Sequence, residues 1–195
     1  MTKLDAVNDI LAAIGEDPVN SLNDGLPDAD LAKRALDRIL VRTQTRGWWF
    51  NREPEARLYP NVDGHIEMPT DVLDFHPIRG DANRLFSVRG GTLYDRKERT
   101  DEFGEPVDLY LVRLLDWEDL PQVFTSYVIT KAARHFQDNR LGSQTHHQYQ
   151  KGDEQEAYAM LMEKEVDNEP ANMTRDSHST MDIAGRFRNP SPYLP

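Results

Sequence analysis

The sequence predicts a mainly α-helical α+β protein. We expect an antiparallel bundle of about four helices, a small inserted antiparallel β subdomain and an extended C-terminal tail. Apolar residues recur at the helical spacings of three and four within about residues 4–46 and 121–168. Between residues 48 and 117, short β-rich runs separated by prolines and glycines replace that period. Residues 171–195 show little periodicity and contain Pro190, Pro192 and Pro195, which is typical of an extended segment.

The first two predicted helices occupy about residues 4–14 and 28–46. Gly15 and Pro18 end the first helix, because glycine suits a helix C-terminus and proline cannot continue it. Pro27 suits the first turn of the second helix, which Gly47 stops. The residues predicted to face the core are Leu4, Val7, Leu11 and Ile14 in the first helix, and Leu31, Ala32, Ala35, Leu36, Ile39 and Leu40 in the second.

The inserted β region is predicted at about residues 48–117. Residues 64–69 form a short candidate strand, and Val107–Leu115 forms a longer one. The two β-rich runs 85–89 and 92–95 flank a Gly-Gly pair that can supply the positive φ angles of a tight turn. We therefore expect a hairpin there.

Three large aromatic residues, Trp48, Trp49 and Phe50, follow the second predicted helix directly. Such side chains bury large apolar areas, so we expect the cluster to anchor the inserted sheet in the core. A sugar-stacking platform is the alternative, but no adjacent motif supports it.

Two further helices are predicted at about residues 121–141 and 143–168. Pro121 suits a first helical turn, and Pro170 marks the end of the last helix. Residues 1–170 would then form a single domain, followed by the tail 171–195. The predicted inward residues are Phe124, Tyr127, Val128, Ala132 and Phe136 in the third helix, and Tyr158, Leu161, Met162 and Val166 in the fourth.

The composition excludes several classes of function. The chain has 23 Lys and Arg against 34 Asp and Glu, a net charge of −11, which argues against a general nucleic-acid binder. An acidic wall would instead let a duplex slide past without sticking. Without cysteine there is no disulfide, thiolate zinc site or cysteine nucleophile. No apolar signal region or membrane-length apolar run is present, so we expect synthesis in a cytoplasm and no membrane insertion.

No catalytic, cofactor or metal site is predicted. The six histidines form no HExxH pattern, and no serine lies in a Gly-x-Ser-x-Gly turn. The segment Arg89–Thr92 precedes a strand rather than a helix, so it is not a phosphate loop. A glycosidase-like pair of carboxylates stays open, because some close pair is expected by chance in so acidic a chain.

An arginine ladder, Arg34, Arg38, Arg42 and Arg46, follows the second predicted helix. Steps of four residues place these side chains on one inclined ridge. The ridge is either a solvated face balanced by nearby aspartates or a surface that meets the carboxylates of a partner. The fourth predicted helix offers an acidic complement, with two lysines against seven acids between residues 143 and 169. Among these acids, Glu154 and Glu163 are candidate interface residues. They would meet an arginine ladder that belongs either to the same chain or to an adjacent copy.

Four collinear segments resemble the tail tubular protein A family of short-tailed phages, and together they cover roughly residues 4–167. They are the opening helix 6–16 with Pro18 and Val19; the junction of Arg46, Gly47 and Trp48 with Phe50 and Asn51; the hairpin residues Val88–Gly91 and Leu93–Arg96; and Arg113, Leu114, Leu120 and Pro121 with residues 127–132 and Arg134.

The resemblance implies a structural virion protein of the tail, without catalysis or cofactor. It implies a dodecameric ring, a head-to-tail adaptor and gatekeeper, between the portal and the tail nozzle, tail tubular protein B, with tail fibres docking nearby. Such a ring would retain the genomic DNA and pass it through its channel without sequence-specific binding.

This role assigns tasks to the candidate residues. A closed ring needs two unlike lateral faces, and the arginine ladder and the acidic fourth helix are candidates for them. The tail 171–195 would dock on the portal through Phe187, Tyr193 and Leu194. Two other functions remain as alternatives: a virion-associated polysaccharide-degrading enzyme, and a chaperone-like assembly factor absent from finished particles.

Overall fold

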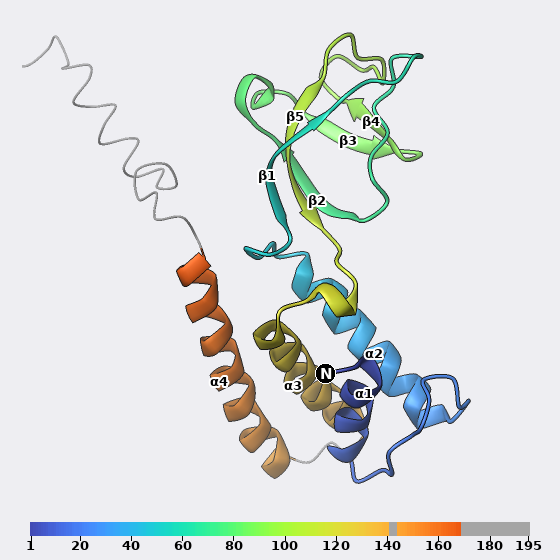
Figure 1. Cartoon of the computed structure of the whole chain (residues 1–195), viewed down its shortest axis with the longest axis vertical. Helices are drawn as coiled ribbons and strands as arrows, with labels where there is room; N and C mark the ends of the chain where they lie inside the picture. The colour runs from blue at the N-terminus through green and yellow to red at the C-terminus, as the bar shows by residue number, and fades with distance from the viewer. Residues whose placement is uncertain (141–143, 169–195) are drawn as a thin grey trace, which may run out of the picture.

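The computed structural model describes residues 1–140 and 144–168 of the chain (Figure 1). Its helices are α1 (Lys3–Ala12), α2 (Pro27–Gln44), α3 (Gln122–Arg140) and α4 (Gln144–Asn168). Its strands are β1 (Arg52–Leu58), β2 (Val72–Pro77), β3 (Phe86–Arg89), β4 (Thr92–Asp95) and β5 (Val107–Arg113). Two short 3-10 helices lie at Arg79–Asp81 and Trp117–Asp119. This mixture of helices and small antiparallel sheets confirms the predicted α+β class.

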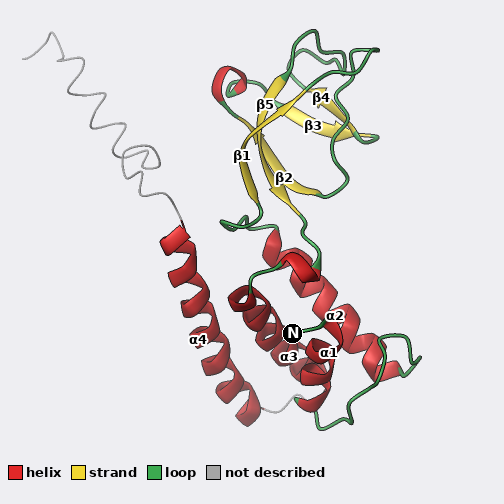
Figure 2. Cartoon of the chain, in the orientation of Figure 1, coloured by secondary structure: helices red, strands yellow, loops and turns green. Residues whose placement is uncertain are grey.

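The helices lie at one end of the molecule and the strands at the other (Figure 2). Helices α1, α2 and α3 contact one another, and α4 packs along α3. We call α1–α4 the helical unit and residues 52–113 the β unit. Each has a hydrophobic core of its own. The core of the β unit consists of Ile66, Met68, Phe86, Leu93, Phe103, Val107, Leu109 and Leu111.

The ends of α1 follow from local chemistry. The Thr2 hydroxyl accepts a hydrogen bond from the Asp5 amide, and the Asp5 carboxylate accepts one from the Thr2 amide, which closes a capping box. At the other end Gly15 has a φ of +80°, and the amide of Glu16 donates back to the Leu11 carbonyl. This left-handed turn satisfies the last carbonyls of the helix.

Helix α2 buries one face and exposes another. Ala32 and Leu36 are fully buried against the other helices, and Ile39 and Leu40 are nearly so. Leu31 was predicted to face the core, but it is 42% exposed. The prediction was wrong because Leu31 lies beside the arginine ladder on the outward side, one position away from the buried Ala32.

The strands form two small antiparallel sheets. One has the order β1-β5-β2, and the other is the β3–β4 hairpin. In the hairpin turn, Gly90 and Gly91 have φ angles of +58° and +86°, which confirms the predicted Gly-Gly turn. The candidate strand at 64–69 was wrong, since these residues form only isolated bridges through His65 and Glu67.

The aromatic residues after α2 lie in the core of the helical unit. Trp48 is 1% exposed, and its ring and that of Phe50 contact Phe124 of α3 edge to face, at centroid distances of 6.0 and 4.9 Å. The Trp48 indole N–H donates to the Thr43 carbonyl at 2.7 Å. The cluster is therefore a core element, as predicted, and it joins the helices beside the β unit.

Two buried amide side chains fix the two connections between the units. Gln44 donates to the Leu115 carbonyl and accepts from the Leu115 amide. Asn51 donates to the carbonyls of Gln44 and Arg113 and accepts from the Trp48 amide. The segment that enters the β unit is thus bonded to the segment that leaves it. We call Gln44 and Asn51 the junction lock.

Helix α4 is tied to the same junction by a carboxylate. Glu165 is 9% exposed, accepts from the Trp49 amide at 3.0 Å and pairs with Arg52 at 2.6 Å. Leu161 is fully buried, as predicted, but Val166 is 68% exposed, and that prediction was wrong. The paired Glu165 takes the inward position, and its neighbour Val166 points to solvent.

Candidate subunit interface

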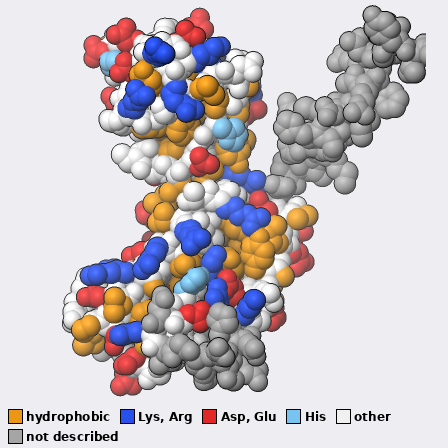
Figure 3. All heavy atoms as spheres, turned by 180° about the vertical axis from the view of Figure 1, so that it is seen from behind, with side chains coloured by type: hydrophobic (Ala, Val, Ile, Leu, Met, Phe, Trp, Pro, Cys, Tyr) orange, Lys and Arg blue, Asp and Glu red, His pale blue; other side chains and the backbone are white. Residues whose placement is uncertain are grey.

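Three residues of the arginine ladder, Arg34, Arg38 and Arg42, lie on the outward face of α2, and Arg46 lies just beyond its end at Gln44. All four side chains are exposed. Lys and Arg side chains follow one another over the helical unit in the view from behind (Figure 3). The side chains of Arg34, Arg38 and Arg42 make no hydrogen bond or ion pair with any described residue. On the same helix Leu31, before Arg34, and Val41, before Arg42, are also exposed, at 42% and 39%. The surface therefore mixes unpaired guanidinium groups with aliphatic side chains.

Arg46, the last residue of the ladder, is engaged within the chain. Its guanidinium donates to the Tyr158 hydroxyl of α4 and lies over the rings of Trp48 and Tyr158. A cation over aromatic faces is held in one orientation. Arg46 therefore ties α2 to α4, and the unpaired part of the ladder consists of the other three arginines.

The acidic residues of α4 do not neutralise the ladder in the same chain. Glu154, a candidate interface residue, is paired instead with Arg134 of α3. Asp37, which could have balanced the ladder, pairs with Lys3 at 2.8 Å. Glu163, the other candidate, is exposed and has no ion pair in the described part of the chain. The structure thus brings Arg46 to α4 but leaves the other three arginines open to solvent.

A groove of about 390 Å³ lies between α3 and α4. Its described lining is Tyr127, Arg134, Lys151, Glu154, Gln155 and Tyr158. Glycoside hydrolysis normally needs two carboxyl groups flanking the scissile bond. In this described lining Glu154 is the single carboxylate, and it is bound to Arg134. The described lining of the groove therefore does not contain the carboxyl pair that this chemistry requires.

Neither a metal-binding cluster nor a membrane-spanning helix is present within the described residues. No three or more His, Asp or Glu side chains of residues 1–140 and 144–168 are grouped to hold a metal ion. No helix within these residues is long and apolar enough to cross a bilayer. The predicted docking residues Phe187, Tyr193 and Leu194 lie outside the described residues.

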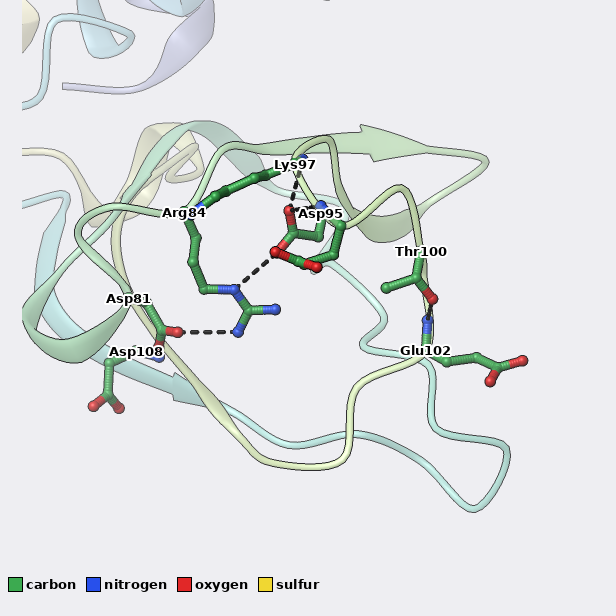
Figure 4. A network of polar contacts seen from close by, with 8 residues as sticks. Asp81, Arg84, Asp95, Lys97, Thr100, Glu102 and Asp108 are labelled. Carbon is green, nitrogen blue, oxygen red and sulfur yellow. Dashed lines mark hydrogen bonds and ion pairs between the residues drawn. The ribbon is translucent and has the colours of Figure 1, made fainter.

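A buried ion-pair network that the sequence did not reveal orders the loop after the hairpin (Figure 4). Asp95 at the end of β4 is fully buried. Its carboxylate accepts from the Arg84 guanidinium at 2.8 Å and from the amides of Lys97 and Glu98. Arg84 also pairs with Asp81 at 3.0 Å, and Asp81 accepts from the Asp108 amide. The network joins the hairpin to β5.

The charge on Asp95 is stabilised in the folded state. Burial alone would raise the pKa of Asp95, but the hydrogen bonds from Glu98, Arg84 and Lys97 outweigh it, so the pKa lies below the ordinary value of 3.8. A lowered carboxyl pKa adds stability above the unfolded-state pKa, and that stability is lost as the pH falls through the folded-state pKa.

We expect Asp95→Asn to lower the free energy of unfolding by about 2–3 kcal/mol at pH 7, because it leaves Arg84 without its buried partner. The difference from the unchanged protein should shrink as the pH falls below the ordinary carboxyl pKa of 3.8 towards pH 3, because the unfolded chain then binds a proton that folded Asp95 resists. Urea unfolding of the two proteins at pH 7 and at pH 3 measures this difference in the free energy of unfolding. Glu98→Gln, at an exposed neighbouring acid, is the control and should change stability by less than about 0.5 kcal/mol. An equal loss at pH 7 and pH 3 would contradict the assignment.

Comparison with known proteins identifies relatives over nearly the whole chain. The profile of a family described as Tail tubular protein matches residues 4–171. The chain is also 32% identical over 188 residues to tail tubular protein A of Klebsiella phage KP34, which covers 96% of this chain and 97% of that protein.

Proposed function

Because the chain belongs to the tail tubular protein family and is a structural component of a phage tail rather than an enzyme, we propose that it is a subunit of the connector ring between portal and tail nozzle. In this proposal the ring extends the portal channel, retains the packaged genome and lets it pass at ejection. The subunit is made in the host cytoplasm and joins the virion tail during assembly.

The unpaired surface of α2 is the observation that supports a ring. A ring closes through contacts between two different faces of neighbouring copies. The side chains of Arg34, Arg38 and Arg42, beside the exposed Leu31 and Val41 of the same helix, have no ion-pair partner within the described part of their own chain. Arginine beside aliphatic residues is typical of protein interfaces. This surface therefore suits a neighbouring subunit.

An exposed stripe of α4 carries the opposite charge to the arginine ladder, also beside an apolar residue. Glu156, Met160 and Glu163 are four and three residues apart, so they share one helix face. All three are exposed, Met160 to 53%, and neither glutamate has an ion pair among the described residues. Carboxylates on either side of an apolar residue match guanidinium groups beside Val41. We infer that the acidic stripe Glu156–Met160–Glu163 of one subunit meets the arginine ladder of the next.

The axial partners belong to the same proposal. The portal would contact one end of the ring and tail tubular protein B the other, with tail fibres docking nearby. The segment 171–195, with Phe187, Tyr193 and Leu194, would reach the portal. Family membership is the support for these partners.

Charge reversal tests the lateral contact. We expect the double variant Arg38→Glu/Arg42→Glu to form no rings when mixed with the portal protein of the same phage, as seen by negative-stain electron microscopy. Its Tm should change by less than about 2 °C, because substitutions at exposed, unpaired positions rarely change stability by more than 0.5 kcal/mol.

A reciprocal variant makes this test specific. Adding Glu156→Arg and Glu163→Arg to the same chain restores opposite charges across the proposed contact, so rings should return. Rings formed by the Arg38→Glu/Arg42→Glu variant would refute the lateral contact. Failure of the reciprocal variant to restore them would remove α4 as the complementary face.

A further inference from the structure

The β3–β4 hairpin carries a concentration of positive charge in an acidic chain. Residues 84–100 contain five cations against two acids, whereas the whole chain has a net charge of −11. One of the two acids, Asp95, is buried and neutralised by Arg84. Lys and Arg side chains gather over the β unit in the view from behind (Figure 3).

Strand alternation divides the hairpin into two faces. Phe86 and Leu93 point into the core of the β unit. The opposite face therefore carries Ser87, Arg89, Thr92 and Tyr94. Arg89 lies over the Tyr94 ring at 3.6 Å, and the Arg96 amide bonds the Leu85 carbonyl, which continues the ribbon by one pair.

The cations of this face and of the following turn are exposed and unpaired. Arg89, Arg96, Lys97 and Arg99 make no ion pair with any described residue. The turn itself is fixed, because Asp95 binds the amides of Lys97 and Glu98 and exchanges hydrogen bonds with the backbone of Thr100. Arg99 has a φ of +59°, a strained value for a residue with a side chain. An ordered turn loses less entropy on binding than a flexible one.

We propose that this cationic ribbon, Arg89, Tyr94, Arg96, Lys97 and Arg99, contacts the phosphate backbone of duplex DNA without reading its sequence. Guanidinium and ammonium groups neutralise phosphates, and a two-stranded β-ribbon is narrow enough to enter a major groove. Outside the ribbon the chain carries a net negative charge, which disfavours phosphate contacts over most of the remaining surface.

An acidic protein is the competing partner, and the composition of the ribbon disfavours it. The centre of a protein–protein interface is usually apolar or aromatic. Two exposed aliphatic residues, Leu85 just before β3 and Val88 within it, are three residues apart and so lie on opposite faces of the ribbon. They form no shared apolar patch, and the one aromatic ring of the ribbon, Tyr94, is covered by Arg89.

Fluorescence anisotropy with the full chain and a labelled 30-base-pair duplex tests the proposal. At about 50 mM NaCl we expect a Kd on the order of 10–100 μM, which is weak, sequence-independent binding. Contacts to about four phosphates would lower the affinity roughly a hundredfold between 50 and 200 mM salt. Duplexes of unrelated sequence should bind equally.

Charge reversal at the ribbon should remove this binding. The triple variant Arg89→Glu/Arg96→Glu/Lys97→Glu is expected to bind at least about tenfold more weakly at 50 mM salt and to lose most of the salt dependence. The triple variant Arg34→Glu/Arg38→Glu/Arg42→Glu has the same net charge but an intact ribbon, and it should retain salt-dependent binding. Circular dichroism verifies that both variants are folded.

Three results would overturn the proposal: no binding by the unchanged protein, equal loss in the two variants, or binding of polyglutamate in place of DNA. The assay needs no ring and no portal. Its outcome is therefore separate from that of the connector role.

Discussion

Replacing Trp48 by alanine is expected to lower the free energy of unfolding by about 4 kcal/mol, a large share of the stability of a small protein. Trp48 is among the largest fully buried side chains, and its ring contacts Phe124. The substitution removes that contact and leaves a cavity between α2 and α3. It also leaves the Thr43 carbonyl without the indole N–H that it accepts.

Chemical denaturation monitored by far-ultraviolet circular dichroism measures this loss, and Trp49→Ala is the matched control. Trp49 is only half-buried and its ring packs on Phe50, so its loss should lower stability by about half as much. Equal effects at the two tryptophans would contradict the central place of Trp48 in the core.

Replacing Asn51 by leucine is expected to lower the free energy of unfolding by about 3–5 kcal/mol, which is the second large effect. Leucine has a similar shape but cannot bond the Trp48 amide or the carbonyls of Gln44 and Arg113. Each buried polar group left without a partner costs about 1–3 kcal/mol. The variant also weakens the tie between the two connections of the helical unit and the β unit, where the Gln44–Leu115 bonds and the Arg113 amide bond to the residue 51 carbonyl remain.

The weaker tie between the two connections distinguishes the junction lock from an ordinary core site. In hydrogen exchange, the Asn51→Leu variant should lose protection at residues 48–52 and 113–117 more than within α1 or α3. Asn83→Leu, at an exposed asparagine of the β unit, is the control and should show neither effect. Uniform loss of protection across the chain would mean that Asn51 does not hold the junction separately.

Much of the helical unit could be predicted because its signals are local. Phe124, Val128, Ala132 and Phe136 recur every four residues, and all four are buried in α3. Gly15 completes the hydrogen bonds at the end of α1 within a few residues of sequence. Such patterns depend on helical geometry alone, so they are readable without knowledge of the partner segments.

Strands β1 and β2 could not be predicted because they are edge strands with weak patterns. β1 contains Pro54 at an irregularity in its pairing with β5, and most of its side chains are exposed or half-buried. β2 ends in Pro77. Proline is tolerated on an edge, where the missing donor faces no neighbour. The central strand β5, with its alternating buried residues, was the one that the sequence indicated.

The polar contacts that join distant segments were also beyond prediction. Glu165 and Trp49 are separated by 116 residues, and Gln44 and Leu115 by 71. Nothing in a sequence assigns one carboxylate among many to one amide. The same limit applied to the arginine ladder, whose periodicity was evident but whose lack of partners required the fold.

The insertion of the β unit between α2 and α3 also orders events during synthesis. All five strands lie within residues 52–113, so this unit can close as soon as its own residues have left the ribosome. The first two helices emerge earlier, but Phe124, against which Trp48 packs, is made only afterwards. The apolar faces of α1 and α2 therefore remain incompletely covered until the β unit and then α3 have been synthesised.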